Sequence, residues 1–280
     1  MSIFTKAQRL NIIERCIKSK EGLIKLSAAL ESSIHRMIDF TSLTRRILYE
    51  DILPKGSHVS TTYPDTKCTV VAGSRRPRRL STRRRVIVPD FIIETTVSIP
   101  LRSFAKTLAN NNFPMKIAKR LTDTETRYLV DCLRVACTEV SKQRIASNSL
   151  RTALPKAIKM IEDHDLRVAN IIAHEDTVIK ISKVFKDGFD KNTRKEILAI
   201  GYYGMLWGSH VFATNIVPRN KIYICAESEF VGVLPVVTNA FCDIACAKKN
   251  KQPCLSVYTQ EEIGMAICNP KAACELTLRY

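Results

Sequence analysis

The sequence predicts an α+β fold, and the order of its predicted elements is what points to that class. A helical arm comes first, followed by a long basic hairpin and an isolated long helix. A mixed segment of helices and strands and a group of terminal strands complete the 280 residues. The isolated helix needs a sheet to cover its apolar stripe, so helices packed on sheets are expected.

Two amphipathic helices are expected before any strand. The first helix is expected over residues 5–20, with Thr5 as a suitable N-cap. Leu10, Ile13 and Ile17 then lie on one face of this helix. Residues 22–37 follow with leucines and an isoleucine at helical spacing. These helices are interpreted as an arm that packs on another structure rather than forming a core of its own.

A long hairpin is expected next, with a polar excursion at its tip. Short β-prone runs at 61–63 and 68–72 precede GSRRPRRLSTRRR at 73–85, and a β-rich run follows at 86–101. The excursion is too polar to pack and too long for a tight turn. Its seven arginines are Arg75, Arg76, Arg78, Arg79, Arg83, Arg84 and Arg85.

The clearest helix is expected over 123–146. Thr122 and Glu125 have the spacing of a capping box at its start. Leu129 and Leu133 continue into an apolar stripe at steps of three and four residues, and neither proline nor glycine interrupts it.

From residue 150 onward, helices and short strands are mixed. Helices are expected at 152–163, with Pro155 in the first turn, at 176–185 and at 192–200, the last ending at Gly201. Strands are expected at 168–173, 205–214, 222–226, 230–237, 241–247, 254–258 and 263–268, followed by a turn and a terminal strand.

Positive charge is concentrated in the first half of the chain. Residues 1–150 carry 27 Lys and Arg against 13 Asp and Glu, whereas residues 151–280 carry 17 against 14. Such a field is typical of proteins that meet nucleic acid, and a basic surface that serves only solubility is the alternative.

The motifs of common enzymes and metal sites do not occur in the sequence. The ten cysteines include no CxxC pair, and Cys242 and Cys246 lack a second pair at zinc spacing. Buried thiols in a reducing compartment are therefore expected. There is no Gly-rich phosphate loop, no HExxH and no GxSxG. We expect neither an enzyme nor a bound cofactor, and no metal.

Three further groups have simple interpretations. His164 stands between Asp163 and Asp165 after a predicted helix, where a solvated loop is expected. Glu261 and Glu262 are adjacent on a strand and must point to opposite faces. Trp207 is expected in the core. No run approaches about 20 apolar residues, and the N-terminus lacks the pattern of a secretory signal, so no membrane partner is expected.

Two C-terminal passages resemble a known family. GYYGMLWGSHVFATNIVPRNKIYICAESEFVGVL contains a glycine, a strand, a Val-Pro turn, a strand and a second glycine, and TQEEIGMAICNPKAACELTL contains an acidic pair, a strand, Asn-Pro-x-Ala and a last strand. Both are similar to the closing passages of Hong Kong 97-type major capsid proteins of tailed phages. The order of elements resembles that family along the whole chain.

The resemblance implies a division into parts. Residues 1–48 would be a helical N-terminal arm, and 49–104 the extended hairpin called the E-loop with its flanking strands. Residues 105–150 would hold the spine helix of the peripheral domain, 151–232 the axial domain at ring centres, and 233–280 the strands that complete the peripheral domain.

The resemblance also implies partners. The chain would assemble with itself into hexamers and pentamers of an icosahedral shell around double-stranded DNA, in the virion, after assembly in the host cytoplasm. A separate scaffolding protein, a portal and decoration proteins would accompany it. An encapsulin-type nanocompartment shell and a basic nucleic-acid binding protein that forms no shell are the alternatives.

Candidate contact residues follow from charge and from the resemblance. In the family the hairpin lies across an adjacent subunit, so the arginine tip is expected to meet carboxylates there. Candidate acidic partners are Glu162, Asp163, Asp165, Glu175, Asp176, Asp187 and Asp190, with Glu196 nearby in the sequence. Candidate DNA-facing residues of the arm are Lys6, Arg9, Arg15, Lys18, Lys20 and Lys25.

Overall fold

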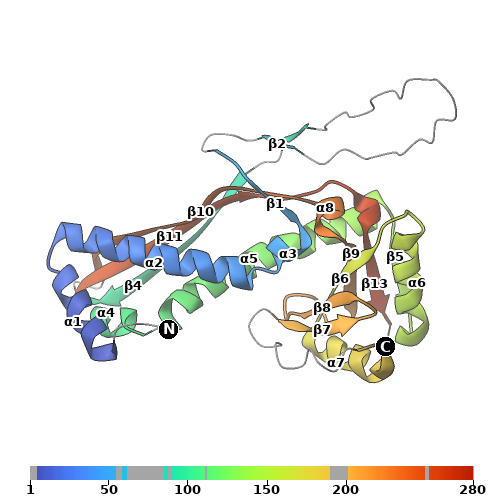
Figure 1. Ribbon diagram of the computed structural model, residues 1–280, viewed down its shortest axis with the longest axis horizontal. Helices are drawn as coiled ribbons and strands as arrows, with labels where there is room; N and C mark the ends of the chain where they lie inside the picture. Colours follow the sequence, from blue (N-terminus) through green and yellow to red (C-terminus); the bar gives the residue numbers. More distant parts are fainter. Residues whose placement is uncertain are drawn as a thin grey trace, which may run out of the picture.

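The computed structural model describes residues 5–54, 59–61, 85–87, 90–110, 112–189, 201–249 and 252–279. Figure 1 shows an elongated lobe, in which helices lie along a long sheet, joined to a second lobe with its own sheet. Buried side chains from both lobes form one continuous hydrophobic cluster.

The N-terminal helices belong to the elongated lobe. α1 (Lys6–Cys16) starts at Thr5, which forms a capping box with Gln8, and α2 (Lys20–Thr41) follows. Ile34 and Ile38 of α2 are fully buried, and α2 packs on the long helix and on the long sheet. The N-terminal helices, predicted to be an arm that packs on another structure, therefore pack on the chain's own core.

The long helix starts earlier than predicted. α5 spans Asn112–Val135 and continues into the π-helical turn η1 (Ala136–Val140), instead of 123–146. Phe113, Ile117 and Leu121 extend the same buried stripe toward the N-terminus, so apolar burial favours helix there as well. The predicted capping box at Thr122 is wrong, because Thr122 and Glu125 are buried inside the helix.

The sheet of the elongated lobe has the strand order β1-β10-β11-β4, with β12 also paired to β10. β1 runs parallel to β10, and the other pairs are antiparallel. The two strands predicted at 230–237 and 241–247 are one strand, β10, with register shifts between Val236 and Phe241. A bulge inserts an extra residue and so interrupts the alternation of side chains without ending the strand, which is why the sequence suggested two strands. The bounds are β1 (Tyr49–Ile52), β4 (Asp90–Pro100), β10 (Gly232–Lys249), β11 (Gln252–Gly264) and β12 (Ala266–Ile267).

The second lobe contains a six-stranded sheet of order β5-β13-β9-β6-β8-β7. The last strand of the chain, expected to complete the peripheral sheet, pairs here with β9 and β5. The predicted strand 205–214 is a hairpin, because Trp207 and Gly208 have φ of 51° and 80° and turn the chain. The bounds are β5 (Arg144–Ser147), β6 (Val168–Ala173), β7 (Tyr202–Leu206), β8 (Ser209–Ala213), β9 (Lys221–Ala226) and β13 (Ala273–Leu278).

Two helices accompany this second sheet, and both were predicted. α6 (Leu150–Glu162) begins two residues before the predicted start, so Pro155 lies in its second turn and not in its first. α7 spans Glu175–Val184. The helix predicted at 192–200 lies outside the described residues. Short helical elements complete the fold: α3 (Thr44–Ile47), α4 (Leu101–Leu108), η2 (Lys186–Gly188), α8 (Ser228–Val231) and η4 (Pro270–Ala272).

The base of the predicted hairpin is present. β2 (Val59–Thr61) pairs antiparallel with β3 (Arg85–Ile87), so the chain leaves and returns at neighbouring positions. The predicted strand 86–101 corresponds to β3 and β4. Residues 62–84, between the two paired strands, lie outside the described part of the chain.

Candidate functional site

The arginine tract lies almost entirely beyond the residues that the structure describes. Arg85 is the first residue of β3, and the other six arginines fall within 62–84. The contact expected between this tract and the carboxylates of a neighbour stays a prediction.

The acidic residues proposed as partners that the structure describes are exposed and lie at three places in the second lobe. Glu162, Asp163 and Asp165 are at the C-terminal end of α6. Glu175 and Asp176 open α7, where Asp176 lies 3.2 Å from Arg219 Nε and 3.5 Å from His174 Nδ1. Asp187 is exposed in η2, whereas Asp190 and Glu196 lie outside the described residues.

Basic residues of the N-terminal helices cluster around the elbow between α1 and α2. Arg15, Lys18, Lys20 and Lys25 are exposed, and Arg9 is half-buried. The backbone of Lys6 begins α1, and its side chain is not described. The elbow therefore presents four cations to solvent.

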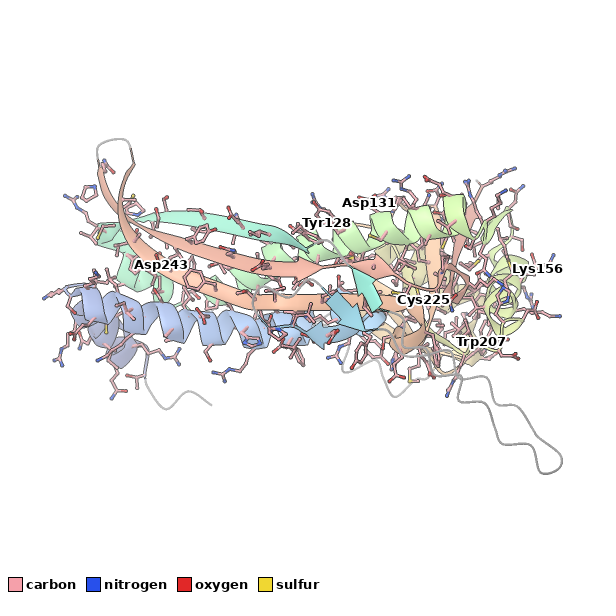
Figure 2. All side chains as sticks on the ribbon, turned by 90° about the horizontal axis from the view of Figure 1, so that it is seen from above. Tyr128, Asp131, Lys156, Trp207, Cys225 and Asp243 are labelled. Atoms are coloured by element: carbon pink, nitrogen blue, oxygen red, sulfur yellow. The ribbon has the colours of Figure 1, made fainter. Side chains whose placement is uncertain are left out.

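The structure extends this basic surface to helices that the sequence did not single out. The exposed acidic side chains of α1, α2, α4 and α5 are Glu14, Glu21, Asp39 and Asp131. Figure 2 shows Asp131 on the outer side of α5. Exposed cations on α2, α4 and α5 are more numerous: Lys20, Lys25, Arg36, Arg102, Lys106, Lys116, Lys119, Arg120, Arg127 and Arg134.

The open face of the long sheet carries the opposite charge. Strand alternation buries Ile93 and Val257 against the helices and turns Glu94 and Tyr258 outward. Asp243 of β10 stands opposite Tyr258 in the register and is exposed (Figure 2). Among the described side chains, this lobe thus has cations on its helices and the carboxylates of Glu94 and Asp243 on its sheet.

A buried arginine joins the N-terminal helices to the sheet. The Arg45 side chain is only 3% exposed. Its Nη1 donates to Asp39 Oδ1 at 2.8 Å and Glu50 Oε1 at 2.9 Å. Its Nη2 donates to Asn239 Oδ1 at 2.6 Å and Glu261 Oε1 at 2.7 Å. The guanidinium therefore connects α2, β1, β10 and β11 at one point.

A strained bulge in β10 places Asn239 at this arginine. The next residue, Ala240, is buried with φ of 88°, a conformation that costs roughly 1–3 kcal/mol for a residue with a Cβ. Strain of that size persists where surrounding contacts hold it. The hydrogen bond from Arg45 to Asn239 is one such contact.

Two fully buried glutamates meet beside Arg45. Glu125 of α5 accepts a hydrogen bond from Ser42 Oγ through Oε2, and its Oε1 lies 3.8 Å from Arg45 Nη2. Burial, followed by the charge of Glu125, raises the pKa of Glu261 well above its usual range, and the attraction of Arg45 does not offset this. The surroundings of Glu261 therefore favour its protonated form more than solvent would.

A second buried carboxylate is fully satisfied. Glu275 of β13 accepts hydrogen bonds from Lys221 Nζ at 2.8 Å, Tyr223 Oη at 3.1 Å and Thr277 Oγ1 at 3.1 Å. Arg144 Nε lies 3.4 Å from Oε1, the oxygen that also accepts from Thr277, whereas Lys221 and Tyr223 donate to Oε2. Burial, followed by the charge of Glu275, raises the pKa of Tyr223. With its partners in place, this cluster fixes the strand order β5-β13-β9.

Sequence patterns contained a signal for the pair at Arg45, although the sequence reading missed it. Glu125 lies midway between Leu121 and Leu129, on the stripe that helical spacing buries. Glu261 alternates in phase with Val257 and Ile263, both buried. The prediction that Glu261 and Glu262 face opposite sides is confirmed, because Glu261 is fully buried and Glu262 is half-exposed.

The other residues considered from the sequence have simple roles. His164 is exposed in the turn after α6, as expected. Trp207 is 49% exposed and packs edge-on against Phe185, so its predicted core position is wrong: the turn at Trp207 directs it outward (Figure 2). The expectation of buried thiols is met only in part: Cys137, Cys225, Cys242, Cys254 and Cys274 are buried and free, whereas Cys16 and Cys132 are half-buried and Cys246 and Cys268 are exposed. Among the described residues, no cluster of side chains suits a metal ion and no helix is long and apolar enough to cross a membrane.

An open cleft of about 1590 Å³ separates α2 and α5 from the second lobe. Phe40 and Met115 line one wall, and Ile179, Tyr202 and Tyr203 line the other. The charged side chains around it are mixed in sign: Arg36, Lys119, Asp123, Arg127, Asp131 and Glu175.

Comparisons by sequence and by structure give different results. No family model matches the chain, and no curated protein matches it. Solved structures do match. The virus-like particle from Pyrococcus furiosus has 15% identity and a TM-score of 0.55, over 89% of this chain and 98% of the other.

Phage structures match over a similar length. A structure from Microbacterium phage Oxtober96 has 10% identity and a TM-score of 0.54, over 85% of this chain and 91% of that one. The capsid structure of the cyanophage P-SCSP1u has 10% identity and a TM-score of 0.53, with coverages of 85% and 88%. Agreement across nearly whole chains at such low identity is agreement of fold, and this chain has the α+β fold of Hong Kong 97-type capsid proteins.

Proposed function

We propose that this chain is the major shell protein of a tailed phage and self-assembles into an icosahedral head around double-stranded DNA. The observation that carries the proposal is the extent of the structural match, because each neighbour cited above is covered over at least 88% of its own length. A chain that kept only one lobe for a different purpose would match only part of such proteins. The role is structural, without enzymatic activity.

The distribution of charge supports a DNA-filled shell over an empty one. The helices of the elongated lobe present many cations and few exposed carboxylates, whereas the open sheet face presents Glu94 and Asp243. Phosphate contacts by exposed Lys and Arg release counterions and need no base-specific geometry. We assign the helical side to the lumen and the sheet side to the exterior.

The parts keep the roles that the resemblance implies. Residues 151–232 would form the axial contacts at ring centres, and the hairpin of the segment 49–104, beyond its flanking strands β1 and β4, would lie across a neighbouring subunit with its arginine tip on carboxylates there. A separate scaffolding protein, a portal and decoration proteins would complete the particle. The protein would assemble in the host cytoplasm and reside in the virion.

Electron microscopy of the purified protein tests the proposal against its two alternatives. Closed shells that contain nuclease-resistant DNA support it. Closed shells that lack nucleic acid support an encapsulin-type compartment instead. Binding of nucleic acid without any closed particle supports a basic binding protein that forms no shell.

A matched pair of variants tests the lumen assignment. Replacing Lys18, Lys20 and Lys25 by Gln should reduce DNA per shell and make its retention more sensitive to salt. Replacing Arg151, Lys156 and Lys159 on α6, which are equally exposed, removes the same charge from the other lobe. Equal losses of DNA in both variants would contradict the assignment to the helices of the elongated lobe.

A further inference from the structure

The buried site around Arg45 has one cation and an excess of carboxyl groups. Asp39 and Glu50 approach the guanidinium at 2.8 and 2.9 Å, and Glu261 approaches at 2.7 Å. Glu125 is the fourth carboxyl, at 3.8 Å. His35 borders the site through contacts with Asp39 and Asn239. With every carboxyl ionised, the negative charges would exceed the single positive charge by three.

One proton would complete the hydrogen bonds of the two buried glutamates. Ser42 occupies one oxygen of Glu125 and Arg45 occupies one oxygen of Glu261. The remaining oxygens, Glu125 Oε1 and Glu261 Oε2, accept no hydrogen bond within the described part of the chain. The two carboxyls meet at one nitrogen, because Arg45 Nη2 lies 3.8 Å from Glu125 Oε1 and 2.7 Å from Glu261 Oε1. Two like charges in this position cannot both persist without cost, so a shared proton is the stable arrangement.

The groups that surround this pair belong to segments far apart in the sequence. Ser42 and Arg45 come from the end of α2 and from α3, and Glu50 comes from β1, which leads to the hairpin. Glu125 comes from α5, whereas Asn239 and Glu261 come from β10 and β11. Loss of the proton would leave one oxygen of each carboxylate, Glu125 Oε1 and Glu261 Oε2, without a donor, and the least costly relief is to admit water between these segments.

The α3 side of the site is the part prepared to move. Thr44 Oγ1 and Arg45 Nε are buried and have no hydrogen-bond partner among the described residues. Exposure to water would satisfy both groups, which lowers the cost of opening on this side. Glu125 and Glu261, by contrast, are part of a 24-residue helix and a 13-residue strand.

We propose that the proton shared by Glu125 and Glu261 is a pH-operated latch, which holds the α2–α3 turn and the root of the long hairpin against α5 and the sheet. At acid pH the latch is closed. As the pH rises through the titration of Glu261, residues 39–52 loosen while the helix and the strand behind them stay in place. The proposal concerns the single chain and does not depend on shell assembly.

Infrared spectroscopy tests the proton directly on the intact chain. A protonated carboxylic acid has a carbonyl band well separated from those of carboxylates. We expect the wild type to show this band near pH 6 and the variant Glu261→Gln to lack it, with Glu262→Gln as the control on the opposite strand face. Equal band intensity in the wild type and Glu261→Gln near pH 6 would overturn the proposal.

Hydrogen exchange tests the movement. After correction for the intrinsic pH dependence of exchange, wild-type peptides covering residues 39–52 should lose protection by up to about tenfold per pH unit between the usual glutamate pKa and the raised pKa of Glu261, and no further above it. Peptides from β6 should not change. Glu261→Gln, a neutral isostere of the protonated acid, should keep residues 39–52 protected throughout, and Glu262→Gln should behave as the wild type.

Two results would refute the movement: protection of residues 39–52 that is constant in the wild type between about pH 5 and pH 9, or an unaltered pH dependence in Glu261→Gln. If Glu261→Gln does not fold, Glu125→Gln replaces it with the same expectations. The wild-type infrared titration alone remains decisive, because absence of a protonated carboxyl above about pH 6 excludes the latch.

Discussion

Replacing Ile38 by Ala measures whether the N-terminal helices are part of the core or a detachable arm. Ile38 is fully buried on α2, which packs on α5 and β10. The change removes three carbons, worth about 2.4 kcal/mol at about 0.8 kcal/mol each, and leaves a cavity that adds to the loss. We expect the free energy of unfolding to fall by about 3–4 kcal/mol.

The same helix provides a matched control. Ile24 of α2 is 60% exposed, and its replacement by Ala should change stability by at most about 0.5 kcal/mol. Both variants have the same chemistry and the same change in helix propensity, so the difference between them isolates burial.

Urea unfolding should be followed by two probes. Circular dichroism reports the whole chain, and the fluorescence of Trp207, the single tryptophan, reports the second lobe. Because buried residues form one cluster across both lobes, we expect Ile38→Ala to lower the midpoint equally for both probes. Equal, small effects of Ile38→Ala and Ile24→Ala would refute the reasoning, as would a Trp207 transition that does not shift.

Three further predictions follow from the charges and thiols. The pKa of Glu261 is raised in the folded protein. Its protonation therefore stabilises the fold fully below the usual glutamate pKa, and this contribution is lost as the pH rises through the raised value. In chemical denaturation, the stability of Glu261→Gln relative to the wild type should increase with pH by up to about 1.4 kcal/mol per pH unit. Burial raises the pKa of Cys225 and of Cys274 to about 12, so iodoacetamide should modify exposed Cys246 of the native protein far faster than either, as peptide mass spectrometry will show. Replacing four arginines of the hairpin tip by Ala should weaken shell assembly or stability and leave DNA content unchanged, in light scattering and in nuclease-protection assays; unchanged stability with less DNA would reverse that assignment. These arginines are Arg78, Arg79, Arg83 and Arg84.

Local patterns predicted the elements whose signals are local. Thr5 and Gln8 cap α1, and the burial of β6 and β9 follows from continuous apolar runs. Where the sequence prediction was wrong, a longer-range contact decided the outcome. The bulge at Ala240 keeps β10 continuous because β11 pairs along its length, and no neighbour in the sequence reveals that pairing.

The buried glutamates show why the site was harder to predict than the fold. Thr122 and Glu125 have the spacing of a capping box, and that local interpretation is sound for an isolated helix. Only the approach of Ser42 and Arg45, some 80 residues earlier in the chain, turns Glu125 into half of a buried pair. A charged residue within an apolar stripe is therefore better treated as a sign of a distant partner than as a helix end.

The glutamate pair of Glu125 and Glu261 matters because it lies next to β1, the strand that leads into the long hairpin. β1 has four residues and lies at the edge of its sheet, where β10 is its partner among the described strands. Beyond that ladder, the backbone hydrogen bond from Leu53 to Val236 and the ion pair of Glu50 with Arg45 attach it to the core. On the β1 side, a force on the hairpin reaches the core partly through these contacts, whereas on its other side the hairpin continues into β4, which pairs with β11. Because Arg45 also holds Glu261, the proton that decides the charge of the glutamate pair also decides how strongly Arg45 is drawn away from Glu50.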